Sequence, residues 1–209
     1  MKKKFNWNVY LLTIIVCLLP MIFGTFIYDS LPDKMPGHWG LNGQPDRYDP
    51  KWVIIYVLPA IMVVFQTLIC AVTDLTKKDP EAKNPKAHRV IRWIIPVITV
   101  ALETVTLIYV FNPEINVGKI LCMVIGVLWV LIGNYMPKIS YEDGLNSMKI
   151  LPKDKDDYKK MMRIGGYAFV ISGLITAIVG IFDEVVAFGV LVGSTIAIAV
   201  ISLYYTFKK

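Results

Sequence analysis

Long apolar runs alternate with short polar segments along the 209-residue chain. Six of the runs contain about 20 residues each, which is the length that an α-helix needs to cross the roughly 30 Å hydrocarbon core of a bilayer. The pattern therefore predicts an all-α, polytopic membrane bundle of six transmembrane helices. The predicted spans are Val9–Tyr28, Trp52–Thr73, Val90–Phe111, Val117–Met136, Ile164–Phe182 and Val185–Phe207.

Lysine and arginine are divided unevenly between alternate connecting segments. If the N-terminus lies inside, the inside segments hold 18 of these residues and the outside segments hold four. Basic segments favour the cytoplasmic side of a membrane, so we predict a multi-pass protein of the cell membrane with both termini cytoplasmic. The first span follows Lys2–Lys4 but lacks a small-residue cleavage site, so we expect it to be retained as a helix.

Composition agrees with a membrane protein. Hydrophobic residues make up 56% of the chain and charged residues 18%, whereas soluble domains have about 45–50% and about 25%. The net charge of +6 then indicates orientation and contact with membrane lipids, with no direct binding of nucleic acid. The three cysteines lie inside apolar runs without metal-ligand spacing. The sequence has no phosphate-binding glycine loop and no hydrolase motif. We therefore expect no enzymatic activity, no metal and no cofactor.

The first outside loop, residues 29–51, is the most informative polar segment. Its prolines and glycines exclude a regular helix, and it is longer than the about 4–6 residues of most connections. We expect an ordered loop that recognises a ligand, or a cap that only shields the helix ends. A metal held by His38, Asp33 and Asp46 is not expected, because this is a weak ligand set. The candidate ligand-binding residues are Pro32, Pro36, His38, Trp39, Gly43, Asp46 and Arg47.

Two polar side chains, Glu103 and Asn134, lie within the predicted spans. A carboxylate at the centre of a transmembrane helix costs roughly 3 kcal/mol, so Glu103 is expected to face the interior of the bundle. It is either a proton- or substrate-sensing carboxylate or a member of a satisfied interhelical hydrogen bond. The candidate partners of Glu103 are a basic group that snorkels inward, or one of Asn134, Gln66, Thr67, Thr104 and Thr106.

Glycines recur in the fifth predicted span. Gly166, Gly173 and Gly180 are spaced by nearly two helical turns, so they share one face of the helix. Small residues let a neighbouring helix approach closely. We therefore expect tight helix packing on this face, either within one chain or in a homodimer.

Two segments resemble known bacterial membrane proteins. LPDKMPGHWGLNGQPDRY, residues 31–48, resembles the loop of a small membrane domain of unknown function. GNYMPKI, residues 133–139, resembles the GN-x-MPK signature of the SdpI family, and these two domains commonly occur in this order. Residues 142–166 depart from the family, which has an Arg-Thr-Pro-Trp stretch there. The residues that match the signature are Gly133, Asn134, Met136, Pro137 and Lys138.

The resemblance implies a division of the chain. Residues 1–75 form an N-terminal membrane domain with two helices and the outside loop 29–51. Residues 76–89 form a cytoplasmic linker, and residues 90–209 form an SdpI-like four-helix membrane domain.

The resemblance also implies a function. SdpI-like proteins are known as immunity proteins that protect a producer cell from its own secreted toxin. We therefore expect an integral membrane immunity or resistance protein that binds a secreted antimicrobial peptide toxin at the outer face. One alternative is a signal transducer that sequesters a cytoplasmic repressor through the inside segment 138–163. The other is a small transporter or channel-like protein that uses Glu103.

Overall fold

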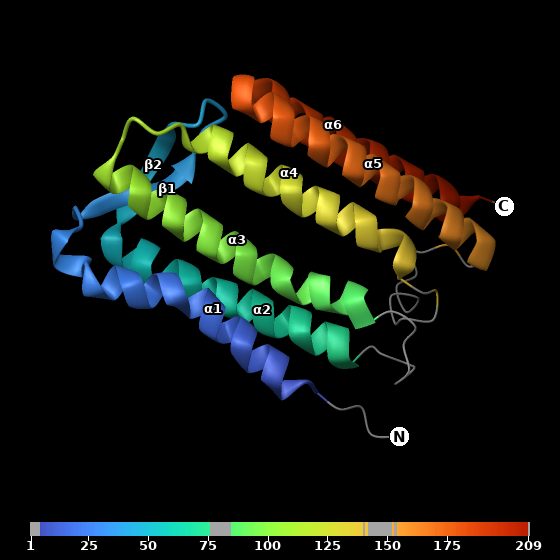
Figure 1. Ribbon diagram of the computed structural model, residues 1–209, viewed down its shortest axis with the longest axis horizontal. Coiled ribbons are helices and arrows are strands. Elements are labelled where there is room, and N and C mark those ends of the chain that lie inside the picture. Colours follow the sequence, from blue (N-terminus) through green and yellow to red (C-terminus); the bar gives the residue numbers. More distant parts are fainter. Residues whose placement is uncertain (1–4, 76–84, 140, 142–151, 153, 209) are drawn as a thin grey trace.

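Six long helices run side by side, and a β-hairpin covers one end of them (Figure 1). The computed structural model describes residues 5–75, 85–139, 141, 152 and 154–208. Within that part of the chain, six helices are long and apolar enough to cross a membrane, where α2 is counted with the π-helical turn Val53–Val57 that precedes it. The predicted all-α bundle of six membrane helices is confirmed. The helices are α1 (Trp7–Phe26), α2 (Leu58–Leu75), α3 (Pro85–Phe111), α4 (Val117–Tyr135), α5 (Lys155–Phe182) and α6 (Glu184–Phe207).

Two helices begin five or more residues before the start that hydropathy predicts. The expected fifth span starts at Ile164, but α5 begins at Lys155, because the Asp154 carboxylate accepts hydrogen bonds from the backbone N–H groups of Asp156 and Asp157, both at 2.9 Å. Similarly, α3 begins at Pro85, so the last residues of the predicted linker 76–89 are helical. Residues 76–84, 140, 142–151 and 153 lie outside the described part of the chain.

The outside loop contains a β-hairpin that the sequence analysis did not identify. Strands β1 (Lys34–Trp39) and β2 (Pro45–Pro50) pair antiparallel, with an irregular register between Pro36 and Trp39. Each strand of a two-stranded ribbon has a free edge, which tolerates prolines that donate no hydrogen bond. Gly43 lies in the turn with a φ of 67°, a conformation that strains residues with a side chain. The prolines and glycines thus exclude a helix, as expected, but they permit a hairpin.

The helices form two groups of three. Helices α1, α2 and α3 pack against one another, as do α4, α5 and α6, and the two groups meet where α3 contacts α4 (Figure 1). The hairpin, the α3–α4 connection and the α5–α6 turn lie at one end of the bundle, which we call the hairpin end. The start of α1 and the end of α6 lie at the other end, which we call the terminal end. In this packing α3 belongs with α1 and α2. The sequence-based division, by contrast, assigns residues 90–209, and so most of α3, to the C-terminal domain; that division stays a prediction.

Glycines bring α4 and α5 into close contact in the C-terminal group. A Cβ added to Gly173 would lie 2.6 Å from the carbonyl oxygen of Gly126, and a Cβ added to Gly166 would lie 2.8 Å from that of Gly133. Real Cβ atoms do not approach backbone oxygens so closely, so these positions need glycine. The face expected for Gly166, Gly173 and Gly180 therefore packs within the chain, against α4.

The GNYMPK motif also belongs to this packing. Met136 and Pro137 lie in the 3₁₀ turn that follows α4, Met136–Lys138. A Cβ on Gly166 would lie 2.8 Å from Pro137, and a Cβ on Gly165 would lie 2.9 Å from Met136. Lys138 places its ammonium group 4.4 Å from the centre of the Tyr135 ring. The motif thus terminates α4. It also packs this end of α4 against the two glycines near which the membrane-spanning part of α5 begins.

Buried polar side chains connect the helices of the N-terminal group near the terminal end. The Arg92 guanidinium of α3 pairs with the Asp74 carboxylate of α2, and both side chains are almost fully buried. Asp74 also accepts a hydrogen bond of 3.0 Å from the backbone N–H of Asn6. The Gln66 amide donates to the Thr13 hydroxyl at 2.8 Å and to the Arg92 carbonyl at 3.0 Å. These bonds satisfy groups that apolar packing alone would leave unpaired.

Candidate functional site

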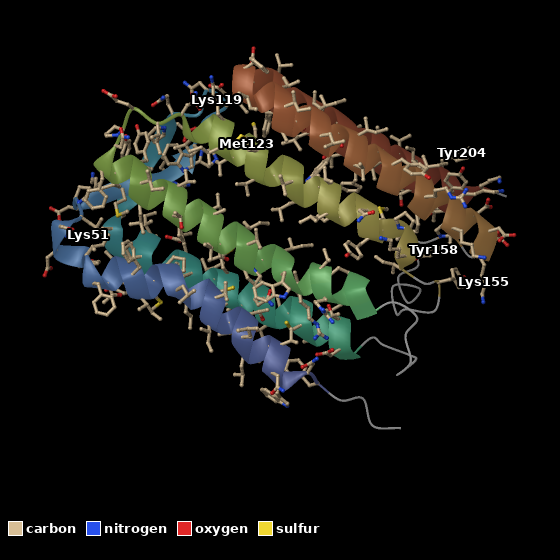
Figure 2. The ribbon with its side chains drawn as sticks, in the orientation of Figure 1. Lys51, Lys119, Met123, Lys155, Tyr158 and Tyr204 are labelled. Carbon is tan, nitrogen blue, oxygen red and sulfur yellow. The ribbon has the colours of Figure 1, made fainter. Side chains whose placement is uncertain are left out.

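The base of the hairpin is fixed to the N-terminal group. Met35 of β1 is fully buried, in a cluster with Leu31, Ile54, Ile55 and Leu107. A second fixing point is the Lys51 ammonium group, which donates hydrogen bonds to the carbonyl oxygens of residues 28 and 31 at 3.3 and 3.1 Å. Figure 2 shows Lys51 at the hairpin end, far from Lys155 and Tyr158 at the terminal end. The hairpin is therefore held as a rigid part of the bundle.

The turn of the hairpin contacts the C-terminal group. A Cβ added to Gly43 would lie 2.6 Å from the side-chain oxygen of Asn116 and 2.8 Å from the backbone nitrogen of Gly118, at the start of α4. The Asn116 side-chain amide donates a 2.9 Å hydrogen bond to the carboxylate of Glu184, the first residue of α6. The hairpin thus bridges both groups of helices. Asn116 and Glu184 were not predicted, since nothing in their sequence spacing links α4 to α6.

The polar side chains of the hairpin pair with one another. His38 and Asp46 are 2.7 Å apart between the imidazole Nδ1 and a carboxylate oxygen, and both are more than half exposed. Arg47 donates to the Asp49 carboxylate at 3.0 Å and to the Gly37 carbonyl at 3.1 Å. These bonds span the irregular part of the strand pairing. His38, Asp46 and Arg47 are thus brought together as the sequence analysis expected, on one exposed ribbon.

The remaining loop candidates are divided between the surface and the interior. Pro32 is exposed in the segment before β1, and Pro36 is buried. Asp33 lies 3.6 Å from the Lys51 ammonium group. Among the described residues, no group of three histidine, cysteine or acidic side chains is placed to hold a metal ion. The polar surface of the hairpin consists instead of ion pairs, next to its aromatic rings.

A cavity of about 340 Å³ lies between the hairpin and helices α2 and α3. Residues 36–39 of β1 form its roof, and Trp39 packs edge-on against Tyr109 with 4.8 Å between ring centres. Glu103, Thr99 and Thr106 of α3 line it. Its walls are apolar and come from Ile54, Leu58, Met62 and Leu102. The outside loop and the intramembrane carboxyl group of Glu103 thus line the same cavity, a proximity that the sequence alone does not indicate.

Glu103 lines this cavity without a partner. The residue is 5% exposed, and within the described part of the chain its carboxyl group makes no hydrogen bond and no ion pair. Of its expected partners, Thr106 lines the same cavity, whereas Gln66 is bonded to Thr13 and Arg92. The described residues thus give Glu103 no interhelical hydrogen bond, and the expected proton- or substrate-sensing role stays a prediction.

The other expected partners of Glu103 lie elsewhere. Asn134 and Thr104 are exposed on the surfaces of α4 and α3. The Thr67 hydroxyl bonds to the carbonyl oxygen of Val63 and lies 3.3 Å from the Tyr10 hydroxyl. Asn134 and Glu103 are thus not brought together, so the two intramembrane polar residues do not form one site.

A second cavity, of about 320 Å³, lies on the other side of the hairpin, against α4 and α6. His38, Trp39 and Asp46 line it together with Glu184 and Phe188. His38 and Trp39 therefore separate two cavities, one in each group of helices. This position makes these two hairpin residues the centre of the candidate site.

The fold and the site define a small membrane-spanning helical bundle with a structured, polar and aromatic hairpin at one face. Residues 15–63, from α1 through the hairpin into α2, match the family described as a domain of unknown function, DUF1648. Over 205 residues the chain is 22% identical to the immunity protein SdpI of Bacillus subtilis (strain 168), an alignment that covers 95% of this chain and 96% of that protein.

A shorter similarity covers only part of the chain. Over 64 residues it is 30% identical to an uncharacterized protein of Archaeoglobus fulgidus, which covers 31% of this chain and 34% of that protein. No solved structure matches the chain. The resemblance to the SdpI family, expected from two short motifs, is thus supported as a distant similarity along nearly the whole chain.

Proposed function

We propose that this chain is an integral membrane immunity protein that protects its cell from a secreted antimicrobial peptide toxin by binding the peptide at the outer face. The observation that carries the proposal is the similarity to the immunity protein SdpI over 95% of the chain, together with six helices that are long and apolar enough to span a membrane. The similarity covers the hairpin as well as the helices, so it is not limited to a shared apolar composition.

The distribution of basic residues supports an outward-facing hairpin. In the sequence, the predicted outside segments hold four lysines and arginines, whereas the predicted inside segments hold 18. Basic segments favour the cytoplasmic side, so this bias orients the termini to the cytoplasm and the hairpin to the exterior. A peptide that attacks the membrane from outside would then meet the hairpin first.

The hairpin has the properties of a peptide-binding surface. Its aromatic and charged side chains, above all His38 and Trp39, are held in place before any ligand arrives, by the ion pair to Asp46 and the ring contact with Tyr109. A preorganised surface loses less conformational entropy when it binds. Aromatic residues at the centre of such a surface supply much of the binding energy.

The test is a protection assay in a sensitive host. Cells that produce the wild-type chain are challenged with a panel of secreted antimicrobial peptides from Gram-positive bacteria. We expect protection against at least one peptide, and a loss of protection for Trp39→Ala and His38→Ala at equal amounts of membrane protein. Gln44→Ala is the matched control, since Gln44 is exposed in the hairpin turn and its side chain is not part of the His38–Asp46 pair.

Two results would contradict the proposal. If the wild-type chain protects against none of the peptides, the immunity function fails. If Trp39→Ala and His38→Ala protect as well as Gln44→Ala, the hairpin is not the binding surface. Sequestration of a repressor, homodimerisation and the absence of enzymatic activity stay predictions from the sequence.

A further inference from the structure

Among the described residues, the buried charged groups are paired with the exception of Glu103. The Asp74 carboxylate faces the Arg92 guanidinium, and both side chains are almost fully buried. Glu103 is equally buried, at 5% exposure, but its carboxyl has no partner among the described residues. An unpaired ionisable group in a membrane helix is costly to keep and usually marks a functional position. The missing partner is therefore expected to come from outside the chain.

The cavity around Glu103 limits what that partner can be. Its volume of about 340 Å³ accommodates a small organic group, at the lower end of the roughly 300–1,000 Å³ typical of ligand pockets. Its walls from α2 and α3 are apolar, at Leu58, Met62 and Leu102, and only threonine hydroxyls and the hairpin add polar atoms. An occupant must therefore combine one positive charge with an apolar body.

The roof of the cavity also suits a cation. Trp39 lies in the cavity lining, and the face of an indole ring attracts ammonium and guanidinium groups. The one other charged or titratable side chain that lines the cavity is His38, which is already paired with Asp46 at 2.7 Å. Lysine and arginine side chains, by contrast, do not line this cavity in the described part of the chain. The electrostatic complement of the site is thus a cation supplied by a ligand.

We propose that the Glu103 cavity binds an organic ammonium group carried on an apolar chain, with the Glu103 carboxylate as its counter-ion. This inference rests on the proposed function for the source of that group, which would be the N-terminal amine or a lysine side chain of the peptide toxin. The hairpin would bind the body of the peptide, while the cavity takes one cationic anchor. Burial of the anchor beside an opposite charge leaves neither group unpaired.

The binding test uses the full chain in nanodiscs of zwitterionic lipid, so that anionic headgroups do not attract the probe. The probe is 4-fluorophenethylammonium, followed by ¹⁹F NMR, and the uncharged comparison is 4-fluorophenethyl alcohol. We expect saturable binding of the ammonium probe to the wild-type chain and about tenfold or greater weakening in Glu103→Gln, which corresponds to about 1.4 kcal/mol or more. Thr104→Val, at the neighbouring exposed position, is the matched control and should bind like the wild type.

A second variant guards against misfolding of Glu103→Gln. Met62→Trp keeps the carboxyl group but fills the cavity, so it should also weaken binding of the ammonium probe. The proposal is overturned if the wild-type chain shows no saturable binding, if Glu103→Gln binds the ammonium probe as tightly as Thr104→Val, or if the alcohol binds as tightly as the ammonium.

The protection assay separates this inference from the proposed function. If the wild-type chain and Glu103→Gln protect cells equally, the cationic anchor is overturned while the immunity function stands. If only Glu103→Gln loses protection and Thr104→Val keeps it, the anchor is supported. If neither the wild-type chain nor any variant protects cells, but binding of the ammonium probe still requires Glu103, the immunity function fails and the cation site stands on its own.

Discussion

The two groups of helices are held together by different means. In the N-terminal group, directional contacts between buried polar side chains connect α1, α2 and α3, with Gln66, Asp74 and Arg92 at their centre. In the C-terminal group, glycines let the backbones of α4 and α5 touch, as at Gly126 and Gly173. Polar contacts select partners by direction and charge, whereas glycine contacts select them by shape alone.

This difference explains where the candidate site lies. A group built on polar contacts can leave a carboxyl group unpaired, and among the described residues of the N-terminal group this is the case for Glu103. The C-terminal group supplies support instead, because its α4 end holds the turn of the hairpin at Gly43. The N-terminal group therefore contains the Glu103 cavity, and the C-terminal group positions the hairpin above it.

The largest expected effect follows from breaking the buried ion pair of the N-terminal group. Arg92→Met removes the guanidinium and leaves the Asp74 carboxylate buried, with the side chains 5% and 3% exposed in the wild type. We expect a loss of about 3–5 kcal/mol in the free energy of unfolding, measured by denaturant titration in micelles with circular dichroism.

The matched control for this prediction removes both charges. Arg92→Met combined with Asp74→Asn removes both charges of the pair, so it should regain most of the lost stability. If the double variant is as unstable as Arg92→Met, or if Arg92→Met is as stable as the wild type, the N-terminal group does not depend on this pair.

A smaller effect is expected from the glycine contacts of the C-terminal group. The new Cβ of Gly173→Ala would meet the Gly126 carbonyl oxygen at 2.6 Å, which forces α4 and α5 apart and should cost about 1–3 kcal/mol. Gly193→Ala in α6 is the control, because a Cβ there meets nothing within 4 Å. The same unfolding titration compares them. Equal stability of the two variants would refute the close α4–α5 contact.

The connection between the two groups gives a further effect. Gly43→Ala places a side chain at a φ of 67° and 2.6 Å from Asn116, and the conformation alone costs about 1–2 kcal/mol. We expect faster hydrogen exchange in β1 and β2, with little change in the helices. Gly40→Ala has its closest contact with the movable side chain of Asn42, at 3.0 Å, and its other contacts lie at an ordinary 3.5 Å, so it serves as the control. Unchanged exchange in Gly43→Ala would show that the hairpin does not depend on this contact.

The smallest effect concerns the cap of α5 at the terminal end, outside the membrane. Backbone N–H groups of Asp157 and Asp156 hold the pKa of the Asp154 carboxyl below its ordinary value of 3.8. The cap therefore stabilises the folded state above the unfolded pKa, and this stabilisation is lost as the pH falls through the folded pKa. We expect exchange of the first α5 amides to speed up only in that acidic range. Asp154→Asn keeps an acceptor oxygen and should abolish this pH dependence; a pH dependence that persists would point to another group.

The sequence predicts the helices well because the bilayer imposes one simple requirement on them. Each span needs about 20 apolar residues, and the chain shows this pattern six times. The ends are harder to predict, since they depend on single side chains such as Asp154, which extends α5 into a charged segment. Hydropathy does not register a cap of this kind.

The candidate site was predicted only in its parts. His38, Trp39 and Glu103 were recognised individually, because polar and aromatic residues stand out in an apolar chain. These three residues line one cavity because of tertiary contacts that the sequence does not show. The main ones are the burial of Met35 beneath the hairpin and the packing of Trp39 on Tyr109. The hairpin itself was missed because its prolines hide the alternating pattern that usually indicates strands.

The proposed function requires that the hairpin and its cavities face the exterior. Single cysteines at Asn42 in the hairpin turn and at Lys155 at the start of α5, in a chain whose buried Cys17, Cys70 and Cys122 are replaced by alanine, would test it. Intact cells are treated with a membrane-impermeant maleimide. If the hairpin faces the exterior, Asn42→Cys is labelled in intact cells and Lys155→Cys only after permeabilisation. The reverse pattern would contradict it.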